Sequence, residues 1–213
     1  CTLSARNPGD IMDKKSQDFT LLTGSRLIDG RGGRPIENAV LLIEDDEIKA
    51  LGQKGSIRIP EGASINEIDY PGMTLLPGLV DCHVHLIGIG DGRSGDELSQ
   101  VPDEVLTLQA SQNAEAHLFS GVTTVRDLGA KNKTTFMLRL AQQMGIANTP
   151  RLILSGRPIA IIGGHLSYFG TTATGAVEGR AAVRQLLGEG ADFIKITATG
   201  GKYKNFSSGE TFF

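Results

Sequence analysis

Apolar residues follow two different patterns along this chain of 213 residues. Between residues 18 and 73 they form short runs, such as "FTLLTGSRLID" and "AVLLIEDDEIKALG", separated by clusters of Gly, Asp and Pro. Short apolar runs with turn residues between them are typical of β-strands, so this segment predicts a small antiparallel sheet. Residues 1–17 are polar and show no hydrophobic period, and we expect a flexible tail there.

From residue 74 onward, strand patterns alternate with helix patterns. The expected strands are 74–87, 122–129, 151–161 and 192–199, and the expected helices are 102–121, 133–145 and 177–190. Pro102 and Gly121 suit the two ends of the first helix, and Asn132 is expected to cap the second. Alternation of this kind is typical of βαβ units and of a parallel sheet, which makes the fold class α/β.

The number of βαβ units limits the architecture. A closed (β/α)8 TIM barrel needs about 250 residues. Residues 74–213 contain only four expected strands. If the fold is a barrel, this segment is a partial one that holds the first four strands.

Composition narrows the classes of partner. The net charge is −3 and the isoelectric point is about 5.8, which gives no electrostatic basis for binding nucleic acid. No apolar run reaches the roughly 18 residues of a membrane span. The chain begins with Cys1, as a processed bacterial lipoprotein or a fragment would, so the expected location is the cytoplasm or the cell envelope. Cys82 lies within the largely apolar segment 75–90, and we expect it to be buried.

The segment "LVDCHVHL" contains two of the four histidines of the chain. Side chains alternate between the faces of a strand, so Asp81, His83 and His85 are expected on one face and Cys82 on the other. Two neutral imidazoles can bind one divalent metal ion. Two core histidines that are hydrogen-bonded to their neighbours remain the alternative.

Lys195 lies in the last expected strand, in "DFIKIT". The same alternation places Ile194 and Ile196 toward the helices and Lys195 toward the opposite face, beside the histidines. A buried lysine is costly unless it is paired or loses its charge. The lysine could therefore be a modified or neutral group in a site, or it could lie at a strand end and reach solvent.

Several segments together resemble one protein family. "PGLVDCHVHL" is similar to the first barrel strand of the amidohydrolase superfamily, and "GVTTVRDLG", "GGH" and "GADFIKITATGG" are similar to later segments of one branch. That branch contains imidazolonepropionase-like proteins and Xaa-Pro or Xaa-Arg/Lys dipeptidases. The resemblance begins near residue 18 and implies that residues 18–73 form the N-terminal part of a small β-sandwich domain, incomplete here.

The resemblance also implies roles for individual residues. His83 and His85 would bind one ion of a binuclear centre, expected to hold two zinc ions, and Lys195 would be carboxylated by CO2 and bridge both ions. His165, in "GGHLSYFG", would contact the reacting carbonyl of the substrate, although a polar loop residue is an equal alternative. No catalytic acid/base is expected in this chain, because the corresponding aspartate would follow Phe213.

The expected activity is metal-dependent hydrolysis of a C–N amide bond in a small molecule or dipeptide. A cyclic-amide hydrolase like imidazolonepropionase is one alternative, and a chain without activity of its own is another. The first and last strands of a half barrel would be open edges. We therefore expect either a homo-oligomer or pairing with a polypeptide that supplies the other half.

Overall fold

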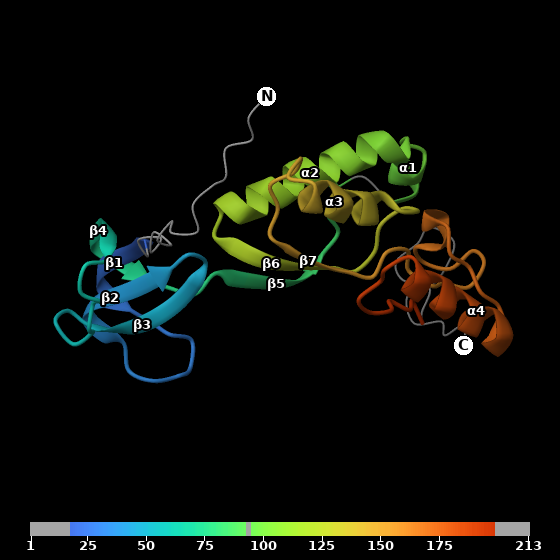
Figure 1. Ribbon diagram of the computed structural model, residues 1–213. Coiled ribbons are helices and arrows are strands. Elements are labelled where there is room, and N and C mark those ends of the chain that lie inside the picture. Colours follow the sequence, from blue (N-terminus) through green and yellow to red (C-terminus); the bar gives the residue numbers. More distant parts are fainter. Residues whose placement is uncertain (1–17, 93–94, 199–213) are drawn as a thin grey trace, which may run out of the picture. The chain divides into compact units, whose positions relative to one another are not determined.

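The computed structural model describes residues 18–92 and 95–198, and the chain divides into two compact units, residues 1–77 and 78–213 (Figure 1). The first unit is a four-stranded sheet in the order β3-β2-β1-β4. Its strands are β1 (Asp18–Leu27), β2 (Ile36–Glu44), β3 (Glu47–Gln53) and β4 (Ser64–Leu75). Its buried centre consists of alternating residues of β1 and β2, namely Phe19, Leu21, Val40 and Leu42.

The predicted antiparallel pairing holds for three of these strands and is wrong for the fourth. β1 pairs with β2 and β2 with β3 in antiparallel fashion, but β4 lies parallel to β1. The reason is the connection after β3, residues 54–63, which returns the chain to the start of β1 before β4 begins. The described sheet is therefore mixed.

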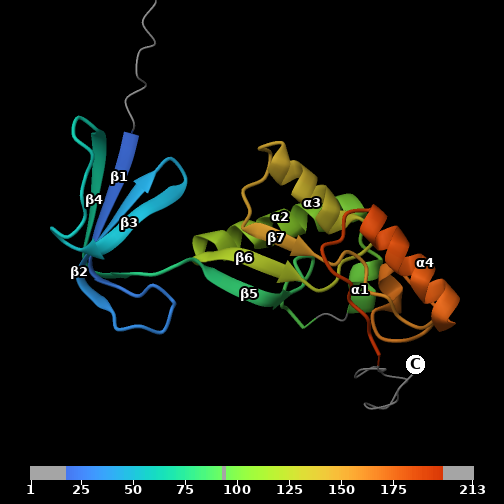
Figure 2. The same cartoon turned by 60° about the horizontal axis from the view of Figure 1, so that its bottom comes forward.

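The second unit contains a three-stranded parallel sheet in the order β5-β6-β7. Its strands are β5 (Leu79–Val84), β6 (Val122–Asp127) and β7 (Arg151–Leu154). Its helices are α1 (Gly95–Ser99), α2 (Asp103–Phe119), α3 (Thr134–Gln143), the 3-10 turn η1 (Ser167–Phe169) and α4 (Gly175–Gly188). α2 and α3 cover the same face of the sheet (Figure 1), and the arrows of β6 and β7 point the same way (Figure 2). The α/β class and the parallel sheet are as predicted.

The core of this unit lies between the helices and that face of the sheet. Leu106, Ala110 and Ala114 recur every four residues along α2, so they form one buried stripe. The stripe packs in one cluster with Val125 of β6 and Leu154 of β7. The apolar core of this unit therefore lies on the helix-covered side of the sheet.

The expected fourth strand is reduced to a single bridge. Ile159 pairs in parallel with Ile196, and the amide of Ile159 donates to the carbonyl of Lys195 at 2.9 Å. Earlier in the segment, the side chain of Asp192 accepts the N–H of Leu154 at 2.7 Å, where a regular ladder would use a main-chain carbonyl. The segment therefore lies beside the sheet without forming a regular strand.

The expected cap of α3 is also corrected. Lys133, not Asn132, occupies the N-cap position, and it makes no side-chain cap hydrogen bond. Asn132 has a left-handed backbone, with φ of 48°, and its amide donates to Asp103 at 2.9 Å. Its side chain thus links the loop before α3 to the first residue of α2 instead of capping α3. Among the residues with described coordinates, no helix has the length and apolar character needed to cross a lipid bilayer.

Candidate metal-binding site

His83 and His85 lie together at the carboxyl end of β5. His83 is on the strand and His85 follows its last residue, Val84. Their ring centroids are 5.6 Å apart, with the ring planes inclined by 60°. The two imidazoles are therefore close enough to act on the same small ligand, at the strand end where sites occur in parallel α/β folds.

A main-chain carbonyl orients the ring of His85. Its Nδ1 lies 2.8 Å from the carbonyl oxygen of Gly129, in the loop after β6. A carbonyl can only accept a hydrogen bond, so Nδ1 carries the proton in this pair. In the neutral ring, Nε2 is then the nitrogen with a free lone pair, which is the form that binds a metal ion.

The side chain of Asp127, at the end of β6, is completely buried. Its two carboxylate oxygens accept the N–H groups of Leu86, at 2.8 Å, and Gly129, at 3.0 Å. Burial raises the pKa of Asp127, while the two N–H groups and the nearby charge of His85 act against that rise. The carboxylate thus joins the loops that follow two neighbouring strands.

Lys195 lies in the segment that continues the sheet beyond β7. Ile194 packs with Ala182 and Leu186 of α4, as the alternation predicted. Phe193, on the other side of the segment, lies under the guanidinium of Arg126, which is 4.7 Å from the ring centroid. Ile196, expected on the same face as Ile194, is 56% exposed, and the segment is not a regular strand, so alternation does not place the Lys195 side chain.

His165 follows β7 and is tied to the same segment. The hydroxyl of Thr197 donates to the carbonyl oxygen of His165 at 2.9 Å. The pKa of His165 is lowered, first by burial and then by the positive charges of His85 and Lys195. His85 and Lys195, which come from two other segments of the chain, are therefore both close enough to His165 to influence its charge.

Asp81 does not share the side of the two histidines. The pairing of β5 with β6 shifts register between Asp81 and Val84, which interrupts the simple alternation. Asp81 instead lies 3.9 Å from Nε2 of His117, in the last turn of α2. His117 thus belongs to the helix side of the sheet and not to the group around His85.

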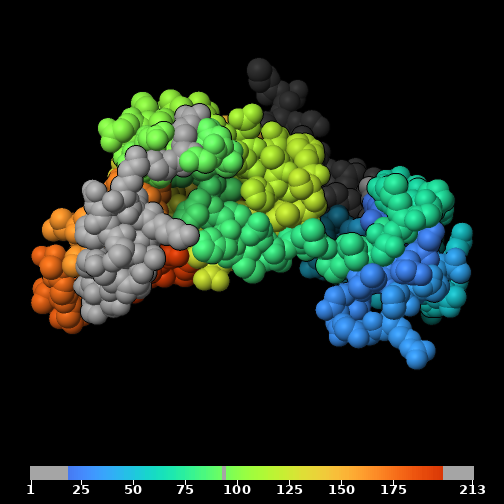
Figure 3. All heavy atoms as spheres, turned by 180° about the vertical axis from the view of Figure 1, so that it is seen from behind, coloured from blue at the N-terminus to red at the C-terminus, as the bar shows by residue number. Residues whose placement is uncertain are grey.

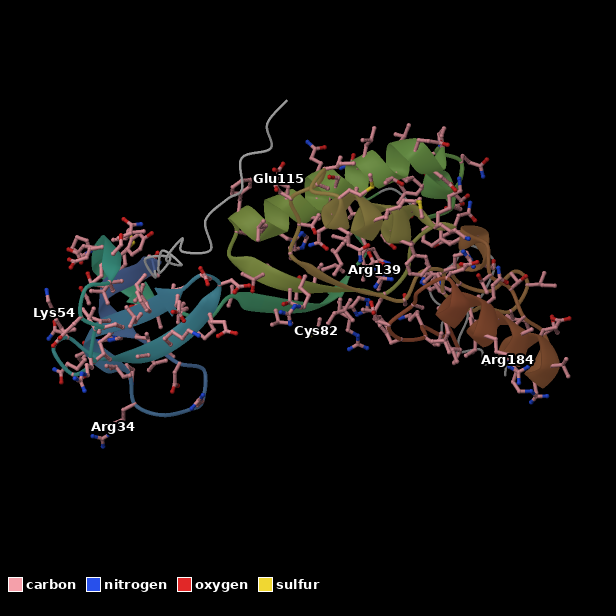
Figure 4. The ribbon with its side chains drawn as sticks, viewed as in Figure 1. Arg34, Lys54, Cys82, Glu115, Arg139 and Arg184 are labelled. Atoms are coloured by element: carbon pink, nitrogen blue, oxygen red, sulfur yellow. The ribbon has the colours of Figure 1, made fainter. Side chains whose placement is uncertain are left out.

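The expected burial of Cys82 is wrong. Its side chain is exposed, and it is labelled on β5 in Figure 4. α2 packs against β6, and within the described sheet no strand lies on the outer side of β5. The atoms of this strand, coloured green, are visible at the surface in Figure 3.

The donor groups fit part of a metal site. Among the described residues, no cluster of three or more His, Cys, Asp or Glu side chains has the arrangement of a complete metal centre. The two imidazoles lie together, and the ring of His85 is fixed so that Nε2 can bind a metal ion. The charge of Lys195 acts on His165, which His85 also influences. The sequence did not indicate the part played by Gly129; the only signal was a glycine two residues after an aspartate at a strand end.

Comparison with known proteins identifies relatives of this chain. The amidohydrolase family profile matches residues 74–209, which is more than half of the chain. Imidazolonepropionase of Agrobacterium fabrum is 24% identical over 177 residues, covering 72% of this chain and 41% of that protein. Ochratoxinase of Aspergillus niger is 26% identical over 229 aligned positions, covering 92% of this chain and 45% of that protein.

Solved structures give the same result. A Xaa-Pro dipeptidase with bound methionine is 31% identical, with a TM-score of 0.73, over 86% of this chain and 48% of that one. The crystal structure of Aspergillus niger ochratoxinase is 26% identical, also with a TM-score of 0.73, over 87% of this chain and 48% of that one. The chain therefore spans less than half the length of these proteins.

Proposed function

The chain belongs to the amidohydrolase family, and on that premise we propose that it contributes part of the active site of a metal-dependent hydrolase acting on C–N amide bonds. Its parallel strands would be the first part of a (β/α)8 barrel, and its first unit would be part of a β-sandwich domain. Two divalent ions, for which zinc suits the imidazole donors, would activate a water molecule and polarise the scissile carbonyl.

The hydrogen bond between His85 and Gly129 is the observation that carries this proposal. It leaves Nε2 of His85 as the available donor, in a ring held at 2.8 Å from a main-chain oxygen. His83 would supply the second imidazole, since its ring centroid is 5.6 Å away. His83 is exposed and His85 is only partly buried, so the pair does not have the full burial expected of two core histidines.

Lys195 would bind the metal centre after reaction with CO2. The amine would form a carbamate, which carries a negative charge and two oxygens that can bridge two cations. Its position near His165 supports this role, because the positive charge of Lys195 contributes to the lowered pKa of His165. An unmodified ammonium group here would repel any bound cation.

His165 would contact the carbonyl group of the substrate. Its lowered pKa favours the neutral ring at physiological pH. The Nδ1 atom of His165 is buried, so Nε2 is the atom that would reach a ligand. A neutral imidazole can donate one hydrogen bond to a carbonyl oxygen without adding charge to a site that holds cations.

Dipeptides of the Xaa-Pro or Xaa-Arg/Lys type are the substrates we propose. The support is the solved Xaa-Pro dipeptidase, which is 31% identical over 86% of this chain. A cyclic amide like that of imidazolonepropionase is the second candidate, favoured by the relative from Agrobacterium fabrum. Because the chain spans less than half of these proteins, a complete active site would need residues from another part of the polypeptide or from a partner.

The test combines metal analysis with assays on Xaa-Pro and Xaa-Arg dipeptides and on imidazolonepropionate. It uses the 213-residue chain and any longer natural polypeptide that contains it. Lys195→Ala should abolish activity and lower the bound zinc. Lys133→Ala is the control, because Lys133 is exposed and its ion-pair partner is Glu189, 3.8 Å away. Absence of bound metal, or full activity of Lys195→Ala, would refute the proposal.

A further inference from the structure

We propose that Asp127 is a positioning residue that sets the orientation and the tautomer of His85 through the main chain of Gly129. The inference rests on the proposed function in one respect, because it takes His85 as a metal ligand. The link has two steps: the Asp127 carboxylate accepts the N–H of Gly129 at 3.0 Å, and the carbonyl of Gly129 lies 2.8 Å from Nδ1 of His85.

The same carboxylate also holds the chain on the other side of His85. Its second oxygen accepts the N–H of Leu86, the residue directly after His85, at 2.8 Å. One buried group therefore fixes both the backbone that carries the imidazole and the oxygen that orients the ring. Movement of either loop would break one of these two hydrogen bonds.

The sheet itself does not require this carboxylate. Main-chain bonds already join β6 to its neighbours, from Leu128 N–H to the Val84 carbonyl at 2.9 Å and from Ser155 N–H to the Asp127 carbonyl at 3.1 Å. A fully buried carboxylate costs free energy unless its oxygens are satisfied. Both carboxylate oxygens accept hydrogen bonds from the two loops next to His85. The carboxylate therefore positions these loops and is not needed to pair the strands.

The absence of a side chain allows Gly129 to bring its carbonyl oxygen close to the ring of His85. Its φ is 148°, and an added Cβ would lie 2.6 Å from Cγ of Pro158 and 3.5 Å from Cε1 of His85. Any other residue would have to displace the proline ring or rotate the peptide. Either change would move the carbonyl oxygen that accepts from His85.

The decisive readout is the tautomer of His85, measured by long-range proton–nitrogen NMR spectra of the metal-free chain after chelation. In the wild-type chain we expect a single neutral form with the proton on Nδ1. Asp127→Asn keeps one acceptor oxygen, so one of the two N–H groups loses its partner, and we expect a mixture of tautomers. Zinc affinity, titrated with Zn²⁺ alone, should fall about 10- to 100-fold.

Asp192→Asn is the matched control for the NMR readout. Asp192 also accepts a main-chain N–H, that of Leu154 at 2.7 Å, but it has no contact with the loop of Gly129 among the hydrogen bonds described here. The variant should lose stability and leave the His85 tautomer unchanged. If Asp127→Asn behaves in the same way, with zinc affinity within about twofold of wild type, the positioning role is wrong.

A folding failure of Asp127→Asn would leave the wild-type spectrum as the test. A proton on Nε2 of His85, or a mixture of tautomers in the wild-type chain, would overturn the inference. Gly129→Ala gives a second variant that acts on the same carbonyl. If the chain bound no zinc but kept the expected tautomer, the proposed function would fail and the positioning of His85 would stand.

Discussion

Two adjacent threonines at the start of α3 are both buried, but their hydroxyl groups differ. The hydroxyl of Thr134 donates to the carbonyl of Lys131 at 2.8 Å, whereas that of Thr135 has no hydrogen-bond partner among the described residues. A buried hydroxyl without a partner is destabilising, and one with a partner is stabilising by about 1 kcal/mol. The pair therefore allows the two cases to be compared in one helix turn.

We predict that Thr135→Val raises the free energy of unfolding by about 1 kcal/mol and that Thr134→Val lowers it by a similar amount. Valine nearly preserves the shape of threonine, so the hydroxyl is the main difference in each case. Urea denaturation followed by circular dichroism would measure both values. A loss of stability in Thr135→Val would show that its hydroxyl does have a partner.

The titration of His165 gives a prediction about pH. Burial, followed by the charges of His85 and Lys195, lowers its pKa in the folded chain below the ordinary value of about 6.5. At a pH between the lowered pKa of the folded chain and the ordinary pKa of about 6.5, the unfolded chain binds more protons at this histidine than the folded chain does. The free energy of unfolding therefore falls as the pH falls below about 6.5. His165→Gln should remove this part of the pH dependence.

The measurement is the free energy of unfolding of wild type and His165→Gln at pH 7.5 and pH 5.5, with chelator present. Groups that the substitution leaves unchanged contribute equally to both proteins. We expect the loss on acidification to be smaller in His165→Gln. An equal loss in the two proteins would contradict the lowered pKa.

At the scale of elements, one arginine joins three loops of the second unit. The guanidinium of Arg157, after β7, donates to the hydroxyl of Thr171 at 2.8 Å, the carbonyl of Asn132 at 3.0 Å and the carboxylate of Glu189 at 2.6 Å. Glu189 caps the end of α4. The side chains of Arg157 and Glu189 are only 7% and 13% exposed, so the pair is largely shielded from water.

We predict that Arg157→Met destabilises the chain by about 3 kcal/mol, because it leaves the largely shielded carboxylate of Glu189 without its main partner. The double variant Arg157→Met, Glu189→Gln should recover part of this loss, since no unpaired charge remains. A double-mutant cycle from urea denaturation measures the coupling. Additive effects of the two substitutions would show that the ion pair contributes little.

Local sequence patterns predicted those helices and strands whose limits depend on residues close together in the sequence. The end signals of α2 and the apolar run of β6 are short-range signals, and these two elements are found close to where they were expected. β7 begins at Arg151 as expected but ends at Leu154, well before the predicted end at residue 161. The parallel pairing of β4 with β1 depends on a connection that has no sequence signal of its own. The exposure of Cys82 likewise depends on which strands and helices lie beside β5, which its own neighbours in the sequence do not reveal.

In the candidate site, too, some features could be predicted from the sequence and others depend on the fold. Spacing alone indicated the pair His83 and His85, and their rings are indeed close, at 5.6 Å. Alternation failed for Asp81, because the register shift in β5 could not be read from side-chain types. The Gly129 carbonyl was not predictable, since main-chain atoms are the same in every sequence and only the folded loop places this one beside His85.

At the scale of the whole molecule, the exposed edge of the parallel sheet is the feature with consequences in solution. Leu79 and Val80 of β5 are 56% and 60% exposed, and among the described strands β5 pairs only with β6. A strand edge with apolar side chains is a template for pairing with another chain. In the proposed barrel, that edge would be closed by further strands, whichever polypeptide supplies them.

We therefore predict that the 213-residue chain alone self-associates in a concentration-dependent way, which sedimentation equilibrium would measure. Val80→Lys places a charge on the edge and should shift the chain toward monomer. Val105→Lys is the matched control, because Val105 is 51% exposed on α2, away from the edge; this variant should associate like wild type. A wild-type chain that stays monomeric at every concentration would mean that the edge of β5 is already protected. Equal effects of Val80→Lys and Val105→Lys on self-association would mean that the chains contact each other elsewhere.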